Sequence, residues 1–263
     1  MTDPSLADDL ALALRLADLA DPMAMASFRS LDLVVETKPD LTPVSDADRA
    51  VERAIRDELA RHRPGDSVLG EEYGVAGDSR RRWIIDPIDG TKNYVRGVPV
   101  WATLIALLVD EEVVVGVVSA PALARRWWAA RGLGAFVTDP GTAEPRQLRV
   151  SAVGHLSDAS FSYSDGVGWS ERGADRGLDL LRSGTWRQRA YGDFWSHMMV
   201  AEGVVDIAAE PVLESYDMAA LIPIVQEAGG LLTAYDGGSA IAGGSALSTN
   251  GLLHGRLLDL LRP

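Results

Sequence analysis

The segment 83–93, Trp-Ile-Ile-Asp-Pro-Ile-Asp-Gly-Thr-Lys-Asn, constrains the fold of this chain more than any other feature. Its first three residues are apolar and predict a buried strand. This strand runs directly into Asp86, and Asp89 follows three residues later. Two carboxylates at close range repel each other, and burial increases the cost. Hard divalent cations with oxygen ligands usually relieve such repulsion, and Mg²⁺ is the common ion beside phosphates. The segment therefore predicts a strand that ends at a metal site.

The two residues after Asp89 suit the binding of an anion. Gly90 permits backbone angles that other residues avoid. The amides of Gly90 and Thr91 can then open a short helix and face a phosphate. A structural alternative stays open, because aspartates at strand ends and helix starts often serve only as caps or turn residues.

Three further acidic groups stand at the ends of predicted elements. Glu71 and Glu72 follow an apolar strand, Asp217 precedes a helical run, and Asp46 lies at the start of a predicted helix. A fold that gathers these ends would build one carboxylate cluster. Taken alone, Asp46 is typical of a helix cap, and we expect Glu72 to be a solvated neighbour rather than a ligand.

The pattern of the chain changes near residue 150. Residues 1–150 predict an α+β half, and residues 151–263 alternate strand-like and helical runs, which is typical of an α/β half. The hydrophobic periodicity predicts helices at 5–28, 45–63, 171–182, 194–202 and 218–228, and strands at 31–36, 67–70, 82–86, 100–109, 113–120, 126–131, 135–138, 159–164, 186–190 and 204–209.

The composition excludes several classes of protein. The chain has 263 residues and a net charge of −13, and such an acidic surface disfavours nucleic-acid binding. The absence of cysteine excludes disulfides, thiolate metal sites and cysteine nucleophiles. No apolar stretch reaches the roughly 18 residues of a membrane span, and the acidic N-terminus is unlike a secretory signal. We therefore expect a cytoplasmic protein that binds neither nucleic acid nor membrane. The histidines stand apart from one another and from the acidic motifs, so nothing in the sequence indicates a histidine nucleophile or a zinc site.

Together, these segments resemble the signatures of the inositol-monophosphatase family. The resemblance rests on Gly-Glu-Glu at 70–72, the segment 83–93, Tyr-Asp-Met-Ala-Ala at 216–220 and Glu-Ala-Gly-Gly at 227–230, and it covers nearly the whole chain in order. It implies a layered αβαβα sandwich, often a homodimer, that hydrolyses small phosphate monoesters with two or three Mg²⁺ ions.

The resemblance also implies a set of metal ligands. Glu71, Asp86 and the carbonyl of Ile88 would hold one Mg²⁺. Asp86, Asp89 and Asp217 would hold a second, and Glu71 would hold a third more weakly. These ions would polarise the phosphoryl oxygens and stabilise the leaving alkoxide.

Phosphate and water would meet next to these ions. The resemblance implies that the amides of Gly90 and Thr91 bind the phosphate. Thr91, helped by Glu71 and by Asp46 behind it, would orient the attacking water.

Two segments, 97–107 and 191–194, resemble the histidinol-phosphatase branch of the family. Asp193 stands where inositol phosphatases usually have a small residue, and an acidic group suits a cationic substrate such as L-histidinol phosphate. Glu210 falls where the family contacts the alcohol moiety. Two alternatives stay open: Asp193 can be an ordinary helix cap, and the substrate can be inositol 1-phosphate or another small-molecule phosphate.

Two rival interpretations come from outside the family. A haloacid-dehalogenase-type phosphatase carries Asp-x-Asp-Gly-Thr after a strand, whereas two residues separate Asp86 from Asp89 here, which is the wrong spacing for a nucleophile and its acid partner. A binding or regulatory protein could keep the fold for protein contacts, but the complete ligand set argues against a purely structural role.

Overall fold

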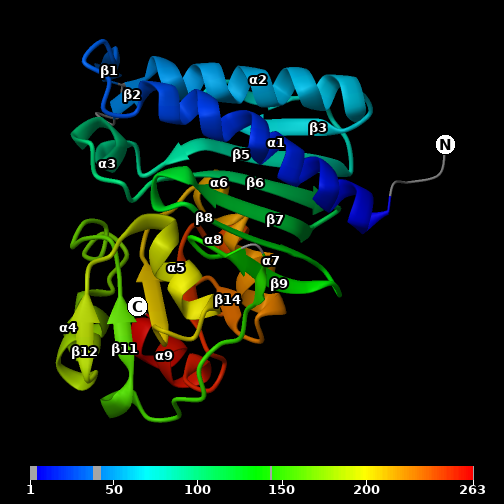
Figure 1. Ribbon diagram of the computed structural model, residues 1–263. Helices are drawn as coiled ribbons and strands as arrows, with labels where there is room; N and C mark the ends of the chain where they lie inside the picture. The colour runs from blue at the N-terminus through cyan, green and yellow to red at the C-terminus, as the bar shows by residue number, and fades with distance from the viewer. Residues whose placement is uncertain (1–4, 38–42, 143, 263) are drawn as a thin grey trace.

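The computed structural model describes residues 5–37, 43–142 and 144–262. Helices and sheets alternate in five layers, α, β, α, β, α, from the two N-terminal helices to the C-terminal one (Figure 1). The helices are α1 (Leu6–Ser27), α2 (Asp46–His62), α3 (Thr91–Arg96), α4 (Asp175–Gly184), α5 (Asp193–Ala201), α6 (Ser215–Met218), α7 (Leu221–Glu227), α8 (Ala240–Gly243) and α9 (His254–Leu261).

Two sheets form the β layers. The larger sheet has the strand order β10-β9-β8-β7-β6-β5-β3-β4, and the smaller has β12-β11-β13-β15-β14. The larger sheet contains β3 (Ser67–Gly70), β4 (Gly74–Ala76), β5 (Arg81–Asp89), β6 (Ala102–Val109), β7 (Glu112–Ala120), β8 (Arg125–Ala130), β9 (Gly134–Thr138) and β10 (Arg146–Gln147). The smaller contains β11 (Ser160–Ser162), β12 (Arg187–Arg189), β13 (Ile207–Glu210), β14 (Leu231–Thr233) and β15 (Ala246–Thr249). A separate hairpin pairs β1 (Val35–Thr37) with β2 (Pro43–Ser45).

One face of the larger sheet is covered by α1 and α2. The side chains of β5 alternate between the two faces of the sheet. Trp83 and Ile85 pack in the cluster beneath these helices, whereas Ile84 packs on the opposite face. At the start of β5, buried Arg81 links the sheet to the helical layer. Its Nη2 donates to Asp9 of α1 at 2.9 Å, and its Nε donates to Asp66 at 3.1 Å.

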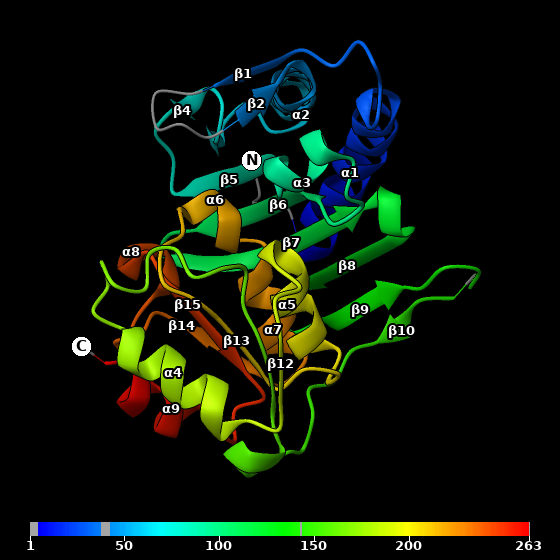
Figure 2. The same cartoon turned by 90° about the vertical axis from the view of Figure 1, so that its left-hand side faces the viewer.

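The other face of the larger sheet packs against α5 and α7, which lie between the two sheets (Figure 2). Phe194 and Met198 of α5 join Ile224 of α7 in this core. The outer face of the smaller sheet is covered by α4 and α9. The middle layer therefore joins residues from both halves of the chain in one core, and whether the halves 1–150 and 151–263 are separate folding units stays a prediction.

Most predicted elements are confirmed, and the misses fall at the C-terminus and at short edge strands. Sequence patterns did not predict β2, β4, β10, β14, β15, α8 or α9. Each of these strands has four residues or fewer, too short for a two-residue alternation to stand out. The smaller sheet is mixed, because β15 runs antiparallel to both β13 and β14. In the described part of the chain, no helix is both long enough and apolar enough to cross a membrane.

A glycine sets the distance between β7 and the middle layer. A Cβ built on Gly116 would lie 2.2 Å from the carbonyl oxygen of Ala220 and 2.7 Å from Cγ of Pro223. Ala220 directly precedes α7 and follows α6. The missing side chain therefore lets the α6–α7 junction rest on the sheet.

We expect Gly116→Ala to lower the free energy of unfolding by about 1–3 kcal/mol, because the added methyl group overpacks this contact. Thermal denaturation measures the change. Gly154→Ala is the matched control: a Cβ there meets nothing within 4 Å, and such a surface change should stay within about 0.5 kcal/mol. Equal melting temperatures for the two variants would show that the close approach is not required.

Candidate active site

The end of β5 carries two carboxylates, of which Asp89 lines a pocket and Asp86 lies buried beside it. Pairing with β6 is regular up to Asp86 and shifts in register before Asp89, because Pro87 has no amide to give the ladder. The Ile88 amide donates to Asp86 Oδ1 at 3.0 Å, and Thr103 Oγ1 donates to the Pro87 carbonyl at 2.8 Å. These bonds fix a bulge of the kind that re-aims side chains at the edge of a sheet.

A third carboxylate reaches the same place from the other half of the chain. Asp217 lies on α6, where its Oδ2 accepts the Glu214 amide at 2.7 Å. One carboxylate oxygen each from Asp86, Asp89 and Asp217 lies within 4.8 Å of the others. Asp89 Oδ2 also accepts the Phe194 amide at 3.0 Å, so α5 touches the cluster. The structure thus brings together the residues that we expect to hold the second ion.

A second acidic group lies beside the first. One carboxylate oxygen each from Asp48, Glu71 and Glu72 lies within 4.8 Å of the others. Glu71 follows β3 directly and lines the pocket. Our expectation that Glu72 is merely a solvated neighbour is wrong, because it is half-buried in this group.

A buried glutamate holds the turn that carries Glu71. The carboxylate of Glu52 accepts the Glu72 amide at 2.7 Å and the Tyr73 amide at 3.2 Å, and it pairs with Arg56 at 2.6 Å. A Cβ on Gly70 would lie 2.0 Å from Glu52 Oε1. The glycine of the Gly-Glu-Glu motif therefore makes room for the carboxylate that positions its neighbours.

The proximity of these groups raises their pKa values. Burial and then repulsion from Glu71 and Asp89 raise the pKa of Asp86 well above its usual value, and burial and then Asp193 and Asp217 do the same for Asp89. Burial also raises the pKa of Asp217 to about 7. Such a set of hard oxygen donors, costly to ionise without a cation, fits a divalent metal site of the magnesium type.

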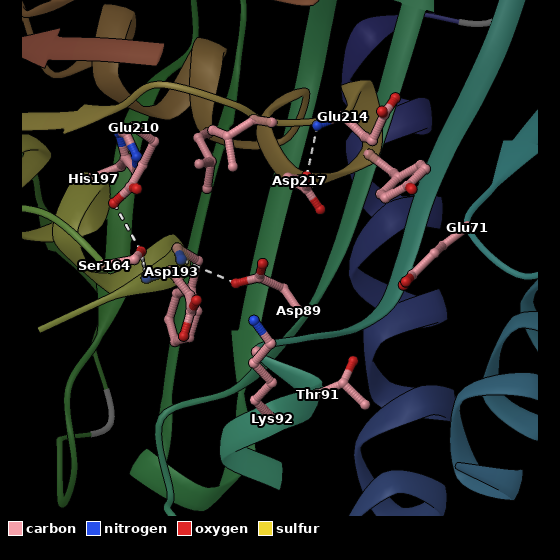
Figure 3. Close-up of a pocket in the computed structure, with 15 residues that line it drawn as sticks. Glu71, Asp89, Thr91, Lys92, Ser164, Asp193, His197, Glu210, Glu214 and Asp217 are labelled. Carbon is pink, nitrogen blue, oxygen red and sulfur yellow. Dashed lines mark hydrogen bonds between the residues drawn. The ribbon is translucent and has the colours of Figure 1, made fainter. Parts of the chain in front are cut away.

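These groups open into one pocket of about 420 Å³ (Figure 3). At the end away from Glu71, Ser164 links the two residues that we expect to select the substrate: its Oγ accepts the backbone amide of Asp193 at 2.8 Å and donates to Glu210 Oε1 at 2.8 Å. Asn93 Nδ2 donates to Asp193 Oδ2 at 2.8 Å. Burial raises the pKa of Asp193 to about 6 and that of Glu210 to about 8.

Comparison with known proteins identifies the family to which this chain belongs. The sequence model of the inositol monophosphatase family matches residues 6–262. The chain belongs to this family. It is 59% identical over 263 residues to a histidinol-phosphatase of Streptomyces coelicolor, with 98% of each chain covered. It is 58% identical over 255 residues to a histidinol-phosphatase of Mycobacterium tuberculosis, covering 97% of this chain and 98% of the relative.

The fold agrees with a solved structure. The crystal structure of the extragenic suppressor protein suhB from Bartonella henselae matches with a TM-score of 0.87 at 30% identity, covering 97% of this chain and 98% of the other. The predicted family and layered sandwich are confirmed, and membership decides against the haloacid-dehalogenase alternative.

One predicted residue of the family site is misplaced. We expected Asp46 behind Thr91, but Asp46 is exposed, and Asp48 Oδ1 instead lies 3.5 Å from Thr91 Oγ1. The two aspartates are about 200° apart around the helix, so only one can face the site. Asp48 is in helical phase with the buried stripe of α2, which consists of Val51, Ile55 and Leu59. That periodicity was the signal that could have identified it.

Other pocket residues were missed for different reasons. His197 lines the pocket although it lies outside the acidic motifs, and burial lowers its pKa to about 4, so it is neutral there. Ser164 and Glu52 carry no motif, and only their contacts reveal them. Lys92 and Asn93 lie inside the family segment, but no pattern of residues assigned a role to either of them.

The carboxylates of the candidate metal site repel one another, so the site can be tested by measuring the stability of the protein. In metal-free protein, we expect Asp89→Asn to raise the melting temperature by about 2–4 °C, on the order of 1 kcal/mol, because it removes one of several repelling charges. The Asn carbonyl can still accept the Phe194 amide. The gain should shrink as the pH falls, because the raised pKa of wild-type Asp89 favours its protonation, which removes the same charge from the wild-type protein.

Scanning calorimetry with EDTA and then with Mg²⁺ makes the comparison. Wild-type protein should gain stability with Mg²⁺, and Asp89→Asn should lose most of that gain. Asp66→Asn is the control of opposite sign, since Asp66 pairs with Arg81 and its loss should destabilise the protein in both conditions. A metal-free Asp89→Asn protein that melted below wild type would contradict the assignment.

Proposed function

We propose that this chain is a Mg²⁺-dependent phosphomonoesterase that hydrolyses L-histidinol phosphate to L-histidinol and phosphate. The observation that carries the proposal is the division of the pocket, which has the metal-type carboxylates at one end and Asp193 with Glu210 at the other. A phosphate ester of a cationic alcohol matches both ends. The two histidinol-phosphatase relatives support the same substrate.

The metal end would hold two or three Mg²⁺ ions. Bound there, the ions supply positive charge that polarises the phosphoryl group and stabilises the leaving oxygen. The residues that we propose as ligands are Glu71, Asp86, Asp89, Asp217 and the carbonyl of Ile88. We also propose that the amides of Gly90 and Thr91 bind the phosphate.

We propose that Thr91 and Asp48 orient the attacking water. Thr91 Oγ1 lies 3.0 Å from the Ile88 carbonyl, to which it donates, and 3.5 Å from Asp48 Oδ1. The remaining lone pair of this hydroxyl can accept a hydrogen bond from the water and so fix the direction of attack. Asp48 is itself held by Ser45, whose amide donates to Oδ2 at 2.8 Å. Burial raises the pKa of Asp48 to about 6, which keeps it able to accept a proton near neutral pH.

At the other end, we propose that Asp193 and Glu210 bind the cationic part of the substrate. Ser164 links the backbone amide of Asp193 to the carboxyl group of Glu210, so the two residues lie at the same pocket wall. A cation between them would favour their ionised forms and offset the burial that raises their pKa values. Asp193 begins α5 with a left-handed φ of 48°. A side chain kept in such a conformation indicates a functional constraint more than a simple helix cap.

The main alternative within the family is an inositol 1-phosphate phosphatase. Steady-state kinetics with histidinol phosphate, inositol 1-phosphate, fructose 1,6-bisphosphate and phosphoadenosine phosphate decides between them. We expect kcat/KM to be highest for histidinol phosphate. A preference for inositol 1-phosphate would overturn the substrate and leave the reaction class intact.

We expect Asp193→Asn to reduce kcat/KM for histidinol phosphate by about ten- to a hundredfold, which corresponds to the loss of one charge-assisted hydrogen bond. Hydrolysis of glycerol 2-phosphate, whose alcohol is neutral, should change much less. Asparagine keeps the bond from Asn93 and tolerates a positive φ better than most residues, so the local structure should survive.

Asp165→Asn is the matched control for this comparison. Asp165 is exposed and close enough to affect the pKa of Asp193, but it does not line the pocket. Its removal should affect both substrates little. Equal losses for both substrates in Asp193→Asn would mean that this residue supports the fold or the metals and does not recognise the substrate. The homodimer and the cytoplasmic location stay predictions.

A further inference from the structure

The pocket poses an electrostatic problem for a phosphorylated substrate. Six of the side chains that line it are carboxylic acids: Glu71, Asp89, Asp193, Glu210, Glu214 and Asp217. The chain around it carries a net charge of −13. A phosphate monoester that enters such a pocket meets repulsion before it reaches any metal. Some positive charge near the phosphate end would lower this barrier.

Lys92 supplies such a charge. Among the described residues that line the pocket, it is the only side chain with a permanent positive charge. It follows Thr91 on α3, and Figure 3 shows its side chain extending up into the pocket toward Asp89. The side chain is exposed, and the described part of the structure shows no ion pair to it. Its ammonium group is therefore available to a ligand.

The electrostatics of Asp193 support this position. Burial raises the pKa of Asp193, and Lys92 opposes that effect. The ammonium group therefore lies close enough to Asp193, one of the two residues that we propose to select the substrate, to affect its ionisation. Lys92 lies on the side of the pocket that also holds Asp89 and Thr91.

We propose that the Lys92 ammonium group binds the phosphoryl oxygens of the entering substrate and of the phosphate product. This inference rests on the proposed phosphatase function and adds a binding residue to it. Lysine binds phosphate as a mobile point charge rather than through a fixed fork. The same charge repels an ammonium group, so Lys92 and Asp193 together would orient a substrate that has a phosphate at one end and a cation at the other.

The experiment compares Lys92→Met with wild type in Mg²⁺ at low and at high ionic strength. At low ionic strength, KM for phosphate esters and the inhibition constant of inorganic phosphate should both rise about tenfold, as expected for the loss of one charge-assisted contact. The fall in kcat should be smaller than about threefold. Added NaCl should narrow the difference between the two proteins, because salt screens an exposed charge.

Two control variants separate direct contact from the general field. Arg96→Met removes the same charge from an exposed position on the same helix that does not line the pocket, and its kinetic constants should match wild type. Lys92→Arg should restore most of the phosphate affinity. Equal effects in Arg96→Met and Lys92→Met, or a loss confined to kcat in Lys92→Met, would overturn the proposal.

The choice of ligands keeps this inference separate from the identity of the substrate. Lys92→Met should weaken the binding of both histidinol phosphate and glycerol 2-phosphate, because both carry the phosphate. Calorimetric titration of inorganic phosphate into the Mg²⁺-loaded protein tests the contact even if the preferred ester is a different one. An unchanged affinity for inorganic phosphate in Lys92→Met would contradict the proposal, whatever substrate the wild-type protein prefers.

Discussion

The repulsion between buried carboxylates is the constraint on which the rest of this structure depends. Asp86 and Asp89 at the end of β5 and Asp217 on the distant helix α6 place their oxygens within 4.8 Å of one another. Each carboxylate accepts a backbone amide, from Ile88, Phe194 and Glu214 respectively. These bonds fix the direction of each group and leave its other oxygen for a cation. The site is thus prepared for metal at a cost in stability that apolar packing elsewhere must offset.

The start of α5 joins the two ends of the pocket. The Phe194 amide binds Asp89 of the metal cluster, and the preceding residue, Asp193, stands on the substrate side and bonds through its own amide to Ser164. A movement of this helix would therefore shift a proposed metal ligand and a proposed substrate-binding group together. The positive φ of Asp193 allows two successive amides to serve different partners.

Close approach between layers is what keeps this arrangement rigid. Gly70 leaves room for the Glu52 carboxylate, which holds the turn of Glu71, and Gly116 lets the α6–α7 junction lie on the larger sheet. At both positions the absence of a side chain permits a contact that no larger residue could make without movement. The small residues thus position the acidic ones.

The sequence alone determined the features that are local. Segment 83–93 showed a buried strand that ends in two carboxylates, and hydrophobic periodicity located most helices and strands of the larger sheet, because both signals lie within a few neighbouring residues. Tertiary structure decided which distant groups meet. Asp46 and Asp48 both stand in the first turn of α2, and the packing of Val51 and Ile55 against the sheet turned Asp48 toward Thr91. Contacts such as Ser164 to Glu210 depend on how separate elements pack, and no local pattern encodes such a distance.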